Sequence, residues 1–178
     1  MDKSHPLTTP MVVRSLEPNK NPFQPREDDE EVFGPEIPYL GAIGALMYLA
    51  NNTRPNIAFD VNLLARFSSD PIDMHWNGIK HIFRYLRGTI DFGLFFPKNS
   101  TTQLIGYVDA GYLSDPHFDK SQSGYVFTYC GTTIFWKSTK QTTVATSTNH
   151  SELIAIYEAS RECVWLWSII KNIRESCG

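Results

Sequence analysis

Apolar residues in the first half of the chain recur at the three- and four-residue spacing of amphipathic helices. This spacing predicts helices over residues 39–52, 56–69 and 74–87, the second with Asn56 as its N-cap. The third is the most regular, and Gly88 ends its pattern. Its apolar stripe consists of Trp76, Ile79, Phe83 and Leu86.

The pattern changes after residue 92 to segments rich in aromatic and β-branched residues, which are typical of strands. We expect strands over Gly93–Phe96, Leu104–Tyr112, Ser123–Cys130 and Thr132–Lys137, the last two joined by a tight turn at Gly131. A long helix over 149–175 follows a polar stretch. The fold class is therefore α/β, with a helical part over 39–98 and then antiparallel strands with one long helix over 102–178.

Residues 1–38 differ from the rest of the chain. They hold 7 of the 11 prolines and 8 acids against 4 bases. Because proline lacks a backbone donor and restricts its predecessor, we expect an extended, acidic and poorly packed arm.

Composition narrows the class of protein. The chain has 178 residues, of which 42% are apolar, so it can bury a core. No apolar run is long enough to span a membrane and no signal peptide is evident, which predicts an intracellular protein, in cytoplasm or nucleus. The net charge of −3 gives no general attraction to nucleic acid. Cys130, Cys163 and Cys177 form no metal-binding or disulfide pattern.

Two acids stand out as candidate catalytic residues and metal ligands. Asp109 lies within an apolar strand, where a carboxylate is costly unless it is paired or metal-bound; the alternative is a strand-end acid that faces water. Glu152 opens the long helix; the alternative is a capping box with Asn149. Carboxylates from a strand and the next helix can share Mg²⁺, although two acids alone are a weak signal.

Other polar residues have simpler explanations. Asp115, His117 and Asp119 suit an ordinary turn, and His150 suits a polar surface. Lys80, Arg84 and Arg87 form a basic stripe on the third helix that could bind a phosphate backbone. The alternative is solvated charge on an amphipathic helix.

Several phrases, in this order, resemble the Pol polyprotein of Ty1/copia-type LTR retrotransposons. They are YLGAIGALMYLANNTRPNIAFDVNLLARFSS, HWNGIKHIFRYLRGT, GYVDAGYLSDP, SQSGYVFTYCGTTIFWKSTKQ and ATSTNHSELIAIYEASRECVWL. The resemblance implies that residues 1 to about 98 are the reverse transcriptase tail and connection. Residues from about 102 would begin a ribonuclease H domain.

By the same resemblance, Asp109 and Glu152 are the first two catalytic acids of a ribonuclease that hydrolyses the RNA strand of RNA–DNA hybrids. The implied cofactor is two Mg²⁺ ions, with Mn²⁺ as a substitute. An intact Pol product is a further possible partner. The alternative function is a non-enzymatic nucleic-acid-binding or assembly remnant that uses helix 74–87.

The sequence departs from the family pattern in one important respect. The family's third and fourth acids lie after the long helix, and this chain ends at Gly178. We therefore expect an incomplete ribonuclease H-like unit that is weakly stable and inactive alone. Gly111 and His150 also stand where many relatives have Asp and Glu.

Overall fold

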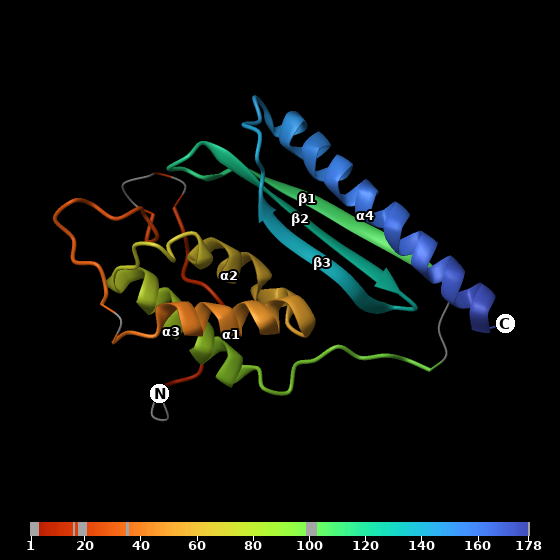
Figure 1. Cartoon of the computed structure of the whole chain (residues 1–178), viewed down its shortest axis with the longest axis horizontal. Coiled ribbons are helices and arrows are strands. Elements are labelled where there is room, and N and C mark those ends of the chain that lie inside the picture. Colours follow the sequence, from red (N-terminus) through yellow and green to blue (C-terminus); the bar gives the residue numbers. More distant parts are fainter. Residues whose placement is uncertain (1–3, 16, 18–20, 35, 99–102, 178) are drawn as a thin grey trace. The chain divides into compact units, whose positions relative to one another are not determined.

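A computed structural model describes residues 4–15, 17, 21–34, 36–98 and 103–177. The chain divides into two compact units, Met1–Gly93 and Leu94–Gly178 (Figure 1). The described residues form four α-helices, one 3₁₀ turn and a three-stranded antiparallel sheet, which confirms a mixed α/β architecture. None of the described helices combines the length and apolar character that a membrane crossing requires.

The first unit is built from short helices. They are α1 (Tyr39–Asn52), the 3₁₀ turn η2 (Pro55–Ile57), α2 (Ala58–Ala65) and α3 (Asp73–Gly88). The prediction for α1 is confirmed at both ends. The second predicted helix is shorter and begins as a 3₁₀ turn. Asn56 is not its N-cap, because the Asn56 side chain hydrogen-bonds Arg54 and the Tyr85 hydroxyl instead.

The core of this unit lies between the helices. Leu46, Ile57, Leu64 and Ile79 are fully buried there, and the Tyr39 hydroxyl donates to the Leu64 carbonyl over 2.8 Å. Burial of large aliphatic side chains supplies the main stabilising term of such a fold, about 25 cal/mol per Å².

The arm contributes to this core. Its described residues form no helix or strand, as its prolines predict. However, Phe23 is only 4% exposed and packs among the core residues. The expectation of poor packing fails at Asn21 and Phe23, which are buried, while the other described residues of the arm are exposed or half-buried.

The second unit contains β1 (Leu104–Asp115), β2 (Lys120–Tyr129), β3 (Thr132–Lys140) and α4 (Thr148–Cys177), with strand order β1-β2-β3. Helix α4 runs along the sheet and packs on β1 and β2 (Figure 1). Tyr125 and Phe127 of β2 form the buried core with Ala159 and Leu166 of α4.

Several boundaries in this unit differ from the prediction: β1 and β3 each extend three residues further, to Asp115 and Lys140, and β2 begins earlier, at Lys120. Cys130 belongs to a two-residue turn with Gly131, and both have positive φ angles, 54° and 76°. Such angles are typical of the turn that matches the twist of a hairpin. Residues 93–96 are not a strand: Phe95 and Phe96 are 79% and 67% exposed, so their apolar character reflects no buried face.

Candidate functional site

Asp109 lies in the middle of β1, opposite Gly124 of β2. Side chains alternate between the two faces of a strand. Val108, the preceding residue, packs with the core beneath α4, whereas Ile105 and Tyr107 are exposed. Asp109 is exposed too and shares their face, opposite the one that α4 covers. Water solvates this carboxylate, so the Asp109 side chain carries no burial cost.

Glu152 follows directly after the first turn of α4, which begins at Thr148, and is half-buried. The capping box predicted between Asn149 and Glu152 is wrong. Ser147 caps the helix: its Oγ accepts from the His150 amide over 3.1 Å. His150 then reaches back, and its Nδ1 accepts from the Thr146 amide over 3.3 Å. Glu152 is consequently not needed as a capping residue.

The two acids thus stand on elements that pack together, β1 and α4. Their carboxylate oxygens are the donors that Mg²⁺ prefers, so the chemistry of the pair fits that ion. The number of donors is small. Across the part of the chain that the structure describes, no group of three or more His, Cys, Asp or Glu side chains is placed to hold a metal.

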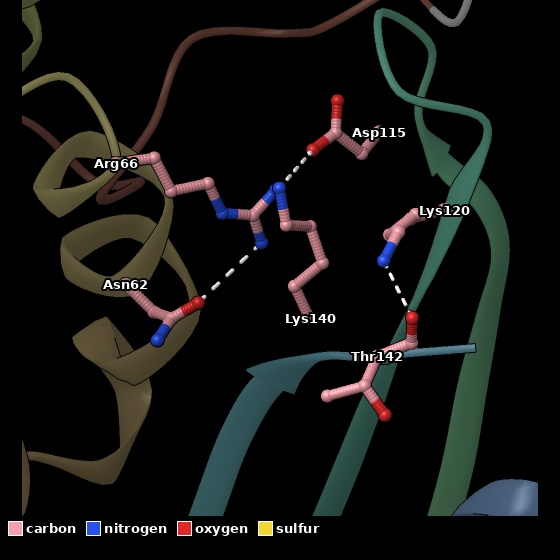
Figure 2. Close-up of polar contacts among 6 residues, drawn as sticks. All are labelled: Asn62, Arg66, Asp115, Lys120, Lys140 and Thr142. Atoms are coloured by element: carbon pink, nitrogen blue, oxygen red, sulfur yellow. Dashed lines mark hydrogen bonds and ion pairs between the residues drawn. The ribbon is translucent and has the colours of Figure 1, made fainter. Parts of the chain in front are cut away.

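The β1–β2 hairpin contains an acid whose setting the sequence did not reveal. Asp115 ends β1 and opens the predicted turn, where its carbonyl accepts from the Phe118 amide over 3.4 Å. It is only 6% exposed, and its carboxylate lies 3.4 Å from the Lys140 ammonium (Figure 2). The same ammonium lies 4.5 Å above the Phe118 ring centroid. Asp119 occupies the left-handed region, with φ of 49°, as expected for an acid in a turn.

The predicted basic stripe lies along α3. Arg84 donates to the His5 carbonyl over 2.8 Å, and Arg87 donates to the Ser4 carbonyl over 2.9 Å. Lys80 is half-buried and lines a cavity of about 550 Å³ with Phe23 and other residues of the arm and helix. The arm therefore engages two of the three cations that sequence patterning proposes for phosphate binding.

Two buried ionisable groups in the first unit also escaped the sequence analysis. Burial raises the pKa of Asp60, which is 4% exposed, to about 7, although the nearby Arg14 opposes the shift. Burial lowers the pKa of His75, which stacks on Phe67 with ring centroids 3.9 Å apart. Each of these residues lies at helical spacing from the buried apolar residues of its own helix. That spacing is the sequence signal that could have identified Asp60 and His75 as buried.

Comparison with known proteins finds several relatives of the chain. The chain is 45% identical over 130 residues to Secreted RxLR effector protein 161 of Plasmopara viticola and spans 92% of that protein. It is 38% identical over 173 residues to the retrovirus-related Pol polyprotein from transposon TNT 1-94 of Nicotiana tabacum. It is also 33% identical over 176 residues to that from transposon RE1 of Arabidopsis thaliana.

The extent of these matches differs. The alignments with the two Pol polyproteins cover 97% of this chain but only 13% and 11% of their own lengths. No family model and no solved structure matches the chain. Matches of this identity along almost the whole chain nevertheless show common descent, and the chain belongs to the family of retrovirus-related Pol polyproteins of copia-type transposons.

Proposed function

We propose that this chain is a Pol segment in which residues 1–98 correspond to the reverse transcriptase tail and connection and residues 102–178 to the first part of a ribonuclease H-like domain. In this proposal Asp109 and Glu152 serve the hydrolysis of the RNA strand of RNA–DNA hybrids. The observation that carries the proposal is that the two acids lie on β1 and α4, two elements that pack together in a chain of Pol ancestry, with Asp109 on the sheet face away from α4.

The two carboxylates would hold Mg²⁺, or Mn²⁺ in its place, as oxygen ligands. When bound, such ions activate water and stabilise the leaving oxygen of a phosphodiester. Two carboxylates do not balance the charge of two divalent ions, so we propose that further acids come from elsewhere in a Pol protein.

The position of each acid suits a separate task. Asp109 stands on the uncovered face of the sheet, where a wide duplex has access. Glu152 is half-buried near the start of α4, which Ser147 caps. Hybrid duplexes are recognised through their backbone and 2′-hydroxyls, which suits an exposed sheet face.

A chimeric enzyme tests this proposal. The matching 173 residues of the TNT 1-94 polyprotein are replaced by this chain, and cleavage of a labelled RNA–DNA hybrid is measured in Mg²⁺. We expect cleavage, and a loss of about 100-fold or more on Asp109→Asn, comparable to loss of one transition-state-stabilising group. Asp119→Asn is the matched control, since it neutralises an acid in a turn that accommodates asparagine equally well.

Equal cleavage by the Asp109→Asn and unchanged chimeras would reject the proposal. The alternative, nucleic-acid binding by α3, predicts a different pattern: affinity that falls with salt and with neutralisation of Lys80 and Arg84 but ignores Asp109. The contacts of Arg84 and Arg87 with the arm count against that alternative, because phosphates would have to displace the arm's carbonyl oxygens.

A further inference from the structure

The connection between β3 and α4 is fastened to the sheet at successive residues. The Lys140 ammonium pairs with Asp115, as described above. The backbone amide of Gln141 donates to the Ser121 carbonyl over 2.9 Å. Lys120 donates from its ammonium to the Thr142 carbonyl over 2.5 Å (Figure 2). The start of α4 therefore follows a segment whose position is set by the β1–β2 hairpin.

Gln141 has a second role at this point. It is fully buried, and its side-chain Nε2 donates to two acceptors. One is the Ser123 Oγ on β2, at 3.0 Å, and the other is the Ser151 carbonyl in α4, at 2.9 Å. Both Ser123 and Ser151 are themselves fully buried, so this single amide group joins the sheet to the first turn of the helix in a dry environment.

The two partners of Gln141 are the chain neighbours of residues that bear on the proposed site. Ser151 precedes Glu152 directly. Ser123 precedes Gly124, the residue paired with Asp109 across the β1–β2 ladder. Loss of the amide would break both contacts between the sheet and the helix; it would also remove the buried Gln141 Oε1, for which the structure shows no hydrogen-bond partner. The contacts thus constrain the backbone beside each acid at once.

We propose that Gln141 is a positioning residue, which fixes the first turn of α4 on the sheet and so sets the position of Glu152 relative to Asp109. This inference rests on the proposed function for its link to metal binding. The anchoring of α4 is a separate structural claim. Groups that orient metal ligands without touching the metal typically change its affinity by about 10- to 100-fold when they are removed.

Gln141→Met is the informative variant, because methionine has similar length and no strong donor. Gln122→Met is its matched control: Gln122 is 5% exposed and donates from Nε2 to Ser138 Oγ over 2.9 Å, within the sheet and away from α4. Both variants remove a buried side-chain amide, one from β2 and one from the residue that follows β3. A comparison between them therefore isolates the contact with the helix from the general cost of the substitution.

Two measurements are made on the full chain. Hydrogen exchange follows the amides of His150 and Ser151, which bond to Ser147. Electron paramagnetic resonance of Mn²⁺ follows metal affinity. Gln141→Met is expected to speed exchange at these two amides about tenfold relative to Gln122→Met and to weaken Mn²⁺ binding about tenfold. Gln141→Asn keeps the amide but is one methylene shorter, so it should also speed exchange and weaken Mn²⁺ binding relative to Gln122→Met.

The outcomes separate the two claims. Exchange and Mn²⁺ affinity equal to those of Gln122→Met would overturn the role of Gln141. If the unchanged chain binds no Mn²⁺ while Gln141→Met still speeds exchange at the first turn, the proposed function fails and the anchoring of α4 stands. If Gln141→Met loses its folded circular dichroism spectrum, Gln141→Asn takes its place. Faster exchange at the first turn than in Gln122→Met then supports the anchoring of α4, and equal exchange overturns it.

Discussion

The two units of the chain bury their apolar side chains in different ways. In Met1–Gly93 several helices and the arm surround one core, to which even the irregular arm contributes Phe23. In Leu94–Gly178 a single helix covers one face of a three-stranded sheet, and Ile105 and Tyr107 on the other face are exposed. The first unit is arranged to enclose a core, whereas the second leaves a surface open.

This difference bears on function. Asp109 lies on the open face, where a large substrate has access. An open apolar face contributes less burial energy, because stabilisation is roughly proportional to the apolar area removed from water. The unit that carries the proposed chemistry is therefore expected to be the less stable of the two.

The largest effect should come from the small core of the second unit. Phe127 is fully buried and packs against Tyr125 and Phe135, with ring centroids 6.0 and 6.4 Å away. Phe127→Ala is expected to cost about 3–5 kcal/mol. Because small domains are only marginally stable, we expect loss of the near-ultraviolet circular dichroism of this unit. A full-size, cooperative unfolding transition in this variant would contradict the comparison.

The first unit should show a distinctive dependence on pH. Burial raises the pKa of Asp60 to about 7, from an unfolded value near 3.8. Its contribution to stability is therefore fully present below pH 3.8 and is lost as pH rises through about 7. The upper limit is about 4 kcal/mol, at 1.36 kcal/mol per pKa unit.

Asp60→Asn should remove this dependence, so that denaturant unfolding at pH 8 shows a more stable variant than the unchanged chain. His75 acts in the opposite sense. Its pKa is lowered by burial, so its contribution is lost as pH falls below the unfolded value of about 6.5. An unchanged stability profile between pH 5 and 8 in Asp60→Asn would show that the carboxyl is not buried as described.

A smaller effect is expected at the start of α4. Ser147→Ala removes the Oγ that accepts from the His150 amide and should cost about 1 kcal/mol. Asn149→Ala is the control, since Asn149 is exposed and does not cap the helix. Thermal unfolding of both variants distinguishes the observed cap from the capping box that the sequence suggested. Equal destabilisation by the two substitutions would count against the Ser147 cap.

The smallest effect on stability concerns the outer face of α4. Leu153, Tyr157, Val164 and Trp167 are more than half exposed there. Trp167→Gln should change the free energy of unfolding by less than about 0.5 kcal/mol. Exposed apolar patches promote association, so the same variant should self-associate less in sedimentation velocity. Unaltered self-association would show that this face of α4 does not mediate association.

Sequence patterning succeeded where local chemistry decides structure. Helix 39–52 was predicted at both ends, and three of the four predicted strands are present in the sheet. It failed where distant residues decide. The extension of β1 to Asp115 includes a register shift after Gly111 and a positive φ at Leu113, and Asp115 pairs with Lys140, 25 positions along the chain.

The site was predicted only in part for the same reason. The apolar strand around Asp109 and the helix that Glu152 opens are visible in the sequence, and the structure places both acids on these elements. The exposure of Asp109 depends on which face α4 covers, which no local pattern states. Gln141 lies in a polar stretch, and its importance becomes apparent only when Ser123 and Ser151 are brought to either side of it.

The most direct test of the account is a double-mutant cycle on Mn²⁺ affinity with Asp109→Asn, Glu152→Gln and the double variant. If the two carboxylates share a metal site, their effects are coupled, and the double variant should lose little more affinity than the stronger single one. Losses that simply add, or single variants that bind Mn²⁺ as tightly as the unchanged chain, would contradict a shared site.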